Sequence, residues 1–538
     1  MVNYWYKNAV IYSLDIKSFA DGNGDGIGDL AGLMQKLDYL ACLGINCIWL
    51  QPLHPSPWKD GGYDVADHYA IDERLGSLPE FIKMTELARE RGIRIMMDLV
   101  ANHTSDQHPW FKDARKHKNS AYRDYYVWET ERPRYHRPNI IFTGKQDSNW
   151  AYDKMAKAWY YHTFYPFQPD LNISHPKVQD EIKNILRFWI KLGVSGFRID
   201  AVPHMLRKKG KEQLPGDAHD LLRKLRTFVD EQGEDIVLMG EADTQHESYS
   251  DFFGERDQLH MLLNFHLNNH LFLALAQKKA RPLTESLNEL LPNSADCNQF
   301  ANFVRNHDEL NIGQLNSTQQ KTVLNAFAPD NNMRIYETGI RRRLPTMLNN
   351  NPRCIKLTYS LLFSLPGTPV LRYGEEIGMG DALALSERNS VRTAMQWTDG
   401  KNGGFSNNSS SWPTISKGPY SFKHINVAAQ AQDRNSLLNT LSRMISLRKA
   451  YSAFGWGQYE IIDCEHPGVL IHVCRRDSNV AVAIHNFTGD TVDVSLSLPE
   501  EERALFTEIL ADQAYEQLNG KVRINGYGYR WFCRWPLA

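Results

Sequence analysis

The sequence predicts an α/β protein built on a parallel sheet, with an antiparallel β domain at its C-terminal end. Short apolar runs that end in polar or acidic residues alternate with helical patterns, which is typical of strands buried on both faces of a parallel sheet. The clearest runs are INCIWLQP, IRIMMDLVANH, VSGFRIDAV, IVLMGEAD, FANFVRNHDE and TPVLRYGEE. From residue 456 onwards the runs QYEIIDC, GVLIHVCRR, VAVAIHNF and TVDVSLSLP follow one another without helical patterns between them.

The helices between the apolar runs have recognisable boundaries. In the segment 77–92, Ser77 and Glu80 form the pattern of a capping box, and Gly92 marks the end. The segment 29–44 has leucines at helical spacing and also ends at a glycine. Strand–helix units joined in this way predict right-handed crossovers between parallel strands.

One long segment interrupts the alternation of strands and helices. Residues 103–172 are rich in Tyr, His, Trp, Asn, Asp and Pro and have weak periodicity, which indicates an inserted subdomain. We therefore expect a catalytic barrel in two parts, 1–102 and 173–454, with this insertion between them. The β domain 455–538 follows the second part.

Composition excludes several classes of function. The 61 Lys and Arg residues balance 63 Asp and Glu residues at a net charge of -2, so we expect no nucleic-acid partner. No basic segment followed by an apolar one opens the chain, and no apolar run of about eighteen residues occurs, so we expect no membrane partner. The seven cysteines are scattered without metal-ligand spacing, which favours free thiols in a cytoplasmic location.

Flat side chains are abundant, since 13 Trp, 24 Tyr and 23 Phe make up 11 % of the chain. Such side chains suit sugar-binding clefts, although a large core also absorbs them. Many of them follow the second predicted strand or belong to the inserted segment, beside the mouth that a barrel would have. They include Tyr63, Trp110, Phe111, Tyr125, Tyr126, Trp128, Trp159 and Phe164.

Acidic residues and their partners recur at the ends of the predicted strands. In a closed barrel of strand–helix units the C-terminal strand ends meet at one mouth, where catalytic groups lie. Four runs bring such residues there, namely Asp98, Asn102, His103, Arg198, Asp200, Glu241, His307 and Asp308. A single acid at a strand end is as often a cap or loop residue, but this combination predicts a catalytic site.

Paired carboxylates carry out glycoside chemistry, in which one attacks the anomeric carbon and the other protonates the leaving oxygen. Arg198 would keep Asp200 ionised, because a nearby cation lowers the pKa of a carboxyl group. Glu241 follows the apolar run IVLM, where partial desolvation would raise its pKa. We therefore predict Asp200 as the nucleophile and Glu241 as the general acid/base.

The blocks DLVANH, GFRIDAV, GEAD and RNHDE, together with QPDLN at residues 168–172, resemble the signature blocks of the α-amylase family of glycoside hydrolases. The resemblance covers nearly the whole chain and implies a (β/α)8 TIM barrel, an inserted B subdomain after strand 3 and a C-terminal antiparallel β-sandwich domain. It implies three catalytic acids, Asp200, Glu241 and Asp308, of which Asp308 grips sugar hydroxyls. The substrate-binding residues that we expect are Tyr63, Asp64, His103, Arg198, His307, Glu309 and Arg392.

Within the family, WYKNAVIY, TSDQHPWF and QPDLN are similar to the exo-acting branch, and YRDYYVW, RNHDEL, GIRRRL and EEIGMGD look most like trehalose synthases. These retaining enzymes interconvert maltose and trehalose through a covalent glucosyl-enzyme, with some hydrolysis to glucose. The implied partner is a small neutral sugar such as maltose, trehalose or a related disaccharide, and a homo-oligomer stays open. The chain departs from their usual Ala at Gly240, before the acid/base.

Two other functions stay open beside this isomerase. One is a hydrolytic α-glucosidase, or a transglucosidase similar to sucrose isomerases, and closure of the loops around Glu309, Arg388 and Arg392 would discriminate between hydrolysis and transfer. The other is a relative without catalysis that only binds carbohydrate, although such relatives usually lose the nucleophile or the acid.

A loop rich in glycine and acidic residues predicts a structural Ca²⁺ site. Oxygen donors stand at positions 1, 3, 5, 7 and 9 of the loop, as in the first part of an EF-hand. Position 12 is a glycine instead of the bidentate glutamate, so the alternative is a turn without an ion. The ligands would be Asp21, Asn23, Asp25, Ile27 and Asp29, and the family resemblance supports them. A second site through Asn102 and Asp170, which some relatives have, stays open because no local spacing supports it.

Overall fold

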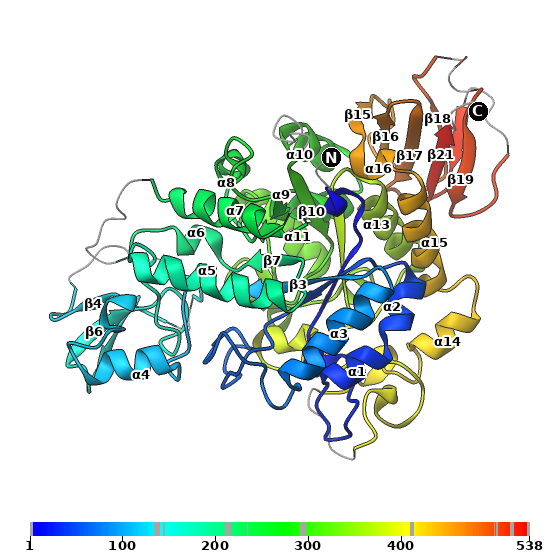
Figure 1. The fold of residues 1–538 in the computed structure, drawn as a ribbon. Coiled ribbons are helices and arrows are strands. Elements are labelled where there is room, and N and C mark those ends of the chain that lie inside the picture. Colours follow the sequence, from blue (N-terminus) through cyan, green and yellow to red (C-terminus); the bar gives the residue numbers. More distant parts are fainter. Residues whose placement is uncertain are drawn as a thin grey trace.

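The computed structural model describes residues 4–133, 140–143, 146–209, 217–233, 235–290, 297–408, 414–499, 501, 504–516 and 521–534. Its centre is a closed barrel of parallel strands in the order β1–β14–β10–β9–β8–β7–β3–β2. The strands are β1 (Ile11–Leu14), β2 (Cys47–Leu50), β3 (Arg94–Leu99), β7 (Gly196–Ile199), β8 (Val237–Gly240), β9 (Met261–Leu263), β10 (Gln299–Phe303) and β14 (Thr368–Arg372). The predicted eight-stranded barrel is thus confirmed (Figure 1).

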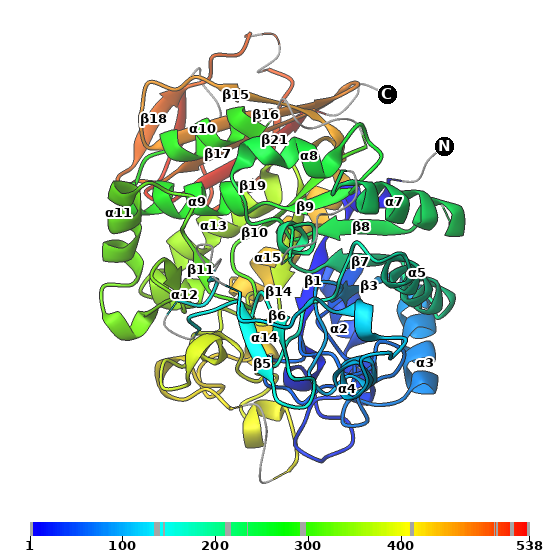
Figure 2. The same cartoon turned by 90° about the vertical axis from the view of Figure 1, so that its left-hand side faces the viewer.

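Helices cover the outside of this barrel (Figures 1 and 2). The longer ones are α3 (Leu78–Glu90), α5 (Pro176–Lys191), α7 (Asp220–Gln232), α9 (Phe265–Gln277), α10 (Arg281–Leu290), α11 (Ser317–Phe327), α13 (Pro352–Ser364) and α15 (Leu437–Ala450). Shorter ones are α1 (Leu30–Gln35), α2 (Leu37–Leu43), α6 (Val202–Met205), α8 (Tyr249–Phe253), α12 (Leu344–Met347), α14 (Val427–Gln432) and α16 (Ala453–Trp456). In the part of the chain described, no helix combines the length and apolar character needed to cross a bilayer.

The two helices whose ends the sequence marks differ in outcome. Ser77 caps α3 as predicted by accepting a hydrogen bond from the backbone N–H of Glu80, and Gly92 beyond its end has a φ of +69°. The segment 29–44 forms α1 and α2 instead of one helix, because Lys36 leaves the helical conformation. The leucines of both pieces still face the core.

Each of the six apolar runs contains a barrel strand. The inward side chains of these strands fill the barrel in layers, and Trp49, Met96, Met239 and Phe303 belong to this buried cluster. Side chains therefore fill the interior of the barrel, and the cavity that contains the acids lies beyond this packed cluster.

Two smaller units, the inserted segment and the C-terminal β unit, extend from the barrel at opposite ends of the view in Figure 1. The inserted segment contains α4 (Pro109–Lys116) and an antiparallel sheet of β4 (Trp128–Glu129), β6 (Ala158–Tyr161) and β5 (Trp150–Asp153). Another small sheet combines β11 (Leu310–Asn311), β13 (Gly339–Ile340) and β12 (Arg334–Ile335).

The C-terminal unit consists of two antiparallel sheets that share an apolar core. One contains β15 (Gln458–Ile462), β16 (Val469–Arg476), β17 (Asn479–Asn486), β21 (Tyr529–Arg534) and β19 (Thr507–Ala511). The other contains β18 (Val492–Ser495) and β20 (Lys521–Ile524). This arrangement confirms the predicted C-terminal β-sandwich.

Candidate active site

A cavity of about 360 Å³ lies at the C-terminal ends of the barrel strands. Asp200 directly follows β7, Glu241 directly follows β8, and Asp308 lies in the loop after β10, so barrel closure brings these three acids to one place. A cavity of this size suits a small ligand. Its other lining side chains include Asp60, Tyr63, His103, Phe142, Phe164, Asp243, Phe265, Glu309 and Arg388.

Arg198, a buried residue of β7, joins three carboxylates at the base of the site. Its Nη1 lies 2.6 Å from Asp98 Oδ1 and 2.6 Å from Asp200 Oδ1, and its Nη2 lies 2.7 Å from Glu241 Oε1. The other oxygen of Glu241 accepts a hydrogen bond of 3.0 Å from the backbone N–H of Ala201. One cation is therefore shared by three acids, which leaves this group with excess negative charge.

The pKa values of the two central acids follow from burial and from that sharing. Burial raises the pKa of Asp200 to about 6 and that of Glu241 to about 7, although Arg198 acts in the opposite direction. Arg198 lowers the pKa of Asp200 as predicted, but burial and the neighbouring carboxylates outweigh this effect, so the pKa is raised overall. The predicted rise for Glu241 agrees with the structure, and Glu241 holds its proton more firmly than Asp200 does.

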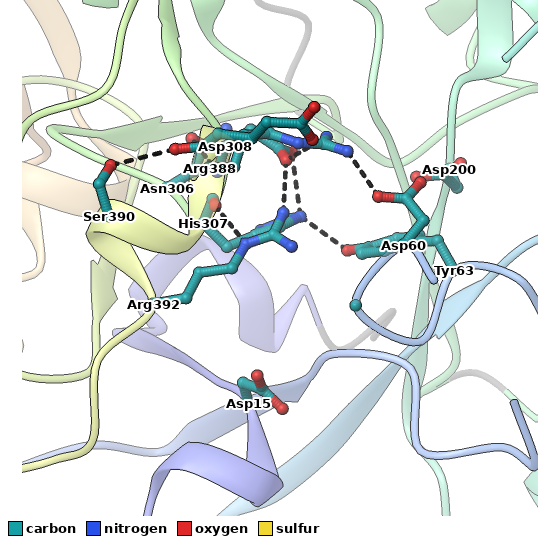
Figure 3. Close-up of polar contacts among 12 residues, drawn as sticks. Asp15, Asp60, Tyr63, Asp200, Asn306, His307, Asp308, Arg388, Ser390 and Arg392 are labelled. Atoms are coloured by element: carbon teal, nitrogen blue, oxygen red, sulfur yellow. Dashed lines mark hydrogen bonds and ion pairs between the residues drawn. The ribbon is translucent and has the colours of Figure 1, made fainter. Parts of the chain in front are cut away.

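Asp308 has the opposite environment (Figure 3). Its Oδ1 accepts hydrogen bonds from Arg388 Nη1 at 2.6 Å and Arg392 Nη2 at 2.9 Å, and its Oδ2 lies 3.0 Å from His307 Nε2. Burial alone would raise its pKa, but His307 and the two arginines hold the pKa of Asp308 well below its ordinary value. Asp308 is thus ionised and suited to accept hydrogen bonds from a ligand.

Tyr63 lines the cavity and packs against the cluster around Asp308. Its ring stacks on the imidazole of His307, with centroids 5.4 Å apart and planes 8° apart. The Tyr63 hydroxyl donates to Asp98 Oδ2 at 3.1 Å and lies 2.8 Å from His307 Nε2. Tyr63 therefore connects the carboxylates around Arg198 to the cluster around Asp308.

The prediction that Asp64 contacts the substrate is corrected by the structure. Its buried carboxylate accepts hydrogen bonds from Ser56 Oγ and from the backbone N–H groups of Lys59 and Asp60, so it organises the loop from within. Asp60 lines the cavity instead, and its Oδ1 lies 2.5 Å from Arg388 Nη2. The two acids flank the same Gly-Gly-Tyr stretch, so the sequence alone did not tell them apart.

The other predicted substrate residues lie at or next to the cavity. His103 and Glu309 line it. Arg198, His307 and Arg392 contact the acids that line it, as described above. Arg388 closes one side, because it bridges Asp60 and Asp308 while its guanidinium lies 5.2 Å from the Phe142 ring centroid.

Most of the aromatic residues expected beside the mouth have a structural role. Of the eight singled out in the sequence, Tyr63 and Phe164 line the cavity. Phe111 stacks on Trp128 with centroids 5.5 Å apart and meets Tyr126 edge to face, so these residues form the core of the inserted unit.

Lys209 occupies the position considered for a second Ca²⁺ ion. Its buried Nζ donates to Asn102 Oδ1 at 2.8 Å and to the carbonyl oxygens of Asn102 and Leu171 at 3.2 and 3.3 Å, and it pairs with Asp170 at 3.0 Å. An ammonium group thus stands among the oxygen atoms that would have held the ion. The sequence left a second site through Asn102 and Asp170 open, and the position of the Lys209 ammonium group argues against an ion there.

The predicted Ca²⁺ loop is closed by its own side chains. Asn23 Oδ1 and Asp25 Oδ1 each accept a hydrogen bond of 2.8 Å from the N–H two residues further on, and the Asp21 carboxylate accepts from Gly24 and Gly26. The Asp29 carboxylate accepts hydrogen bonds from the backbone N–H groups of Gly22, Asn23 and Gly32. Through the bond from Gly32, Asp29 caps α1. The oxygen donors are therefore folded into one compact turn.

Comparisons with known proteins agree with this architecture. Residues 11–457 match the model of the alpha amylase catalytic domain. The chain is 37 % identical over 544 residues to a trehalose synthase/amylase of Mycobacterium tuberculosis, covering 98 % of this chain and 90 % of the relative. It is 31 % identical to an oligo-1,6-glucosidase of Heyndrickxia coagulans, covering 91 % and 93 %. A crystal structure of a trehalulose synthase superposes with a TM-score of 0.80 at 25 % identity, covering 98 % and 100 %.

Proposed function

Because the chain belongs to the α-amylase family, we propose that it transfers an α-glucosyl group between small acceptors and interconverts maltose and trehalose. The observation that carries the proposal is the meeting of Asp200 and Glu241 on the two terminal nitrogens of Arg198. The resemblance to trehalose synthases over nearly the full chain supports the choice of sugar.

In the first step, protonated Glu241 gives its proton to the glycosidic oxygen while the Asp200 carboxylate attacks the anomeric carbon. The bond to the leaving glucose breaks and an ester bond to Asp200 forms. In the second step, Glu241 takes a proton from the anomeric hydroxyl of the turned glucose, whose oxygen attacks the glucosyl carbon and releases Asp200. Asp308 accepts hydrogen bonds from hydroxyl groups of the glucosyl ring throughout.

Transfer requires that water stay out while the glucosyl-enzyme exists, because hydrolysis is the competing reaction. The contacts of Arg388 with Asp60, Asp308 and Phe142 support such closure, since they connect three separate segments over one side of the cavity. We therefore assign Arg388 to the acceptor side.

Incubation of the purified chain with maltose tests the proposal. We expect trehalose to appear before glucose accumulates when the products are separated over time. Glucose without trehalose at any time would overturn the isomerase and leave the hydrolytic α-glucosidase, which the likeness to oligo-1,6-glucosidase supports. Full turnover by an Asp200→Asn variant would overturn the mechanism, because an amide cannot form the ester. Comparison of the parent with that variant also tests the alternative of a relative that only binds carbohydrate, because such a relative would have no turnover to lose.

We also propose that the loop from Asp21 to Asp29 holds a structural Ca²⁺ ion. The loop gathers side-chain oxygens of Asp21, Asn23, Asp25 and Asp29 in one turn, and such a set fits a hard divalent cation. The carboxylate oxygens do not all gather within 4.8 Å of one another, but oxygens on opposite sides of Ca²⁺ lie up to about 5 Å apart. A chelator should lower the unfolding temperature and added Ca²⁺ should restore it, whereas no response to either would reject the site.

A further inference from the structure

A second group of metal-binding side chains lies outside the sugar cavity. His246, His266 and Glu289 each offer one ligand atom, and these atoms lie within 4.8 Å of one another. They come from the short 3-10 helix His246–Ser248 after β8 and from helices α9 and α10. Figure 2 shows α10 beside α9. Because 20 or more residues separate the three, local spacing in the sequence does not reveal the group.

One carboxylate oxygen has an imidazole on each of two sides, one within hydrogen-bond distance and one further away. Glu289 Oε2 lies 2.7 Å from His266 Nε2 and 3.9 Å from His246 Nε2, so both imidazoles direct the same ring nitrogen at one oxygen. The rings lie side by side, with centroids 4.3 Å apart. Ligand atoms around a tetrahedral ion with bonds of 2.0–2.1 Å are about 3.3 Å apart, so ion binding would lengthen the 2.7 Å contact and shorten the 3.9 Å contact by about 0.6 Å each.

We propose that His246, His266 and Glu289 form a binding site for Zn²⁺, with a water molecule as the fourth ligand. Two imidazoles and one carboxylate favour Zn²⁺ and similar transition metals over Ca²⁺ or Mg²⁺. Glu247 Oε2, 3.4 Å from His246 Nδ1, is placed to orient that ring, as a carboxylate behind a metal-binding histidine does. The Glu289 side chain is 43 % exposed, which gives an ion access from solvent.

The position of this site links it to the catalytic face. The segment from Glu241 to His246 begins with the predicted acid/base and includes Asp243, which lines the cavity. His266 follows Phe265, another cavity residue. A bound ion would therefore fasten the end of the Glu241 loop to α9 and α10, and we expect it to raise the unfolding temperature.

The test uses the full chain without a polyhistidine tag, stripped of metal and kept in Ca²⁺ so that the other loop is supplied. Zn²⁺ is titrated by calorimetry, and Co²⁺ is added separately as a spectroscopic probe of tetrahedral coordination. We expect one Zn²⁺ per chain, at least tenfold weaker binding in His246→Gln and in Glu289→Gln, and no change in His424→Gln, a control at an exposed histidine.

Both test variants replace partly exposed side chains, and their unfolding temperatures without Zn²⁺ show whether they fold like the parent. The proposal is overturned if the parent chain binds no Zn²⁺, or if either variant binds it as tightly as the parent. It is also overturned if His424→Gln weakens binding to the same extent. Activity is not needed for this test, so its result is independent of the proposed function.

Discussion

Replacement of Lys209 by alanine tests whether its ammonium group takes the place of a divalent cation. Loss of one partner from a buried ion pair costs about 3–5 kcal/mol, because the other charge stays buried. We expect about 3 kcal/mol, since Thr163 donates two further hydrogen bonds to the Asp170 carboxylate through its N–H and hydroxyl groups, at 2.8 and 2.6 Å. Loss of the bonds to Asn102 acts in the same direction.

The expected change in unfolding temperature follows from the unfolding entropy. The unfolding entropy is about 2.1 cal/mol/K per residue, so a barrel unit of roughly 450 residues unfolds with an entropy of about 1 kcal/mol/K. A loss of about 3 kcal/mol therefore corresponds to a fall of about 3 °C. Differential scanning calorimetry measures it, and Lys208→Ala, at an exposed neighbouring position, is the control.

Calcium distinguishes this explanation from a simple loss of packing. The oxygens left behind in Lys209→Ala are the kind that Ca²⁺ prefers, so millimolar Ca²⁺ should raise the unfolding temperature of the variant more than that of the parent. The rise in unfolding temperature that Ca²⁺ causes in the parent measures the contribution of the loop from Asp21 to Asp29. An equal Ca²⁺ response in both proteins, or an unchanged unfolding temperature in the variant, would refute the reasoning.

Three other predictions concern catalysis and packing. The pH profile of kcat/KM should be bell-shaped, rising as Asp200 ionises near its pKa of about 6 and falling as Glu241 loses its proton near about 7; a flat profile between pH 5 and 9 would contradict it. Asp60→Asn removes the ion pair with Arg388 and should raise the ratio of glucose to transfer product several-fold in product analysis. An unchanged ratio would count against closure of the cavity by Arg388. Gly240→Ala should cost about 1–3 kcal/mol in thermal unfolding, because its Cβ would lie 2.4 Å from Leu259 Cδ1. If that contact is the cause, the loss in the double variant with Leu259→Ala should be smaller than the sum of the two single losses.

The sequence predicted the barrel because its buried strands are apolar on both faces and end in acidic residues. The signal becomes weaker as a strand becomes shorter, and β9 has only three residues, Met261–Leu263, which are too few for a pattern. The break at Lys36 was not predicted, because the leucines on both sides keep the spacing of one continuous helix.

The candidate site was predictable to different depths. Asp200 and Glu241 directly follow strands, so barrel geometry fixes their positions once the strands are known. Asp60 and Arg388 lie in loops 328 residues apart, and their ion pair depends on how both loops run. Lys209 is likewise 107 residues from Asn102, so no local pattern could place its ammonium among those oxygens.

The charges around the cavity fall into two groups with different functions. Around Arg198 one cation faces Asp98, Asp200 and Glu241, so negative charge exceeds positive charge where an oxocarbenium-like centre would develop. Around Asp308, by contrast, two arginines balance Asp308 and Asp60. The sequence predicted the contact of Arg198 with Asp200, and the structure adds Asp98 and Glu241 to it. Burial raises the pKa of Glu241, and Arg198, which is shared with two other carboxylates, does not offset this rise. Glu241 can therefore keep its proton close to neutral pH while Asp308 stays ionised nearby, and this difference separates an acid from a hydroxyl-binding carboxylate within one cavity.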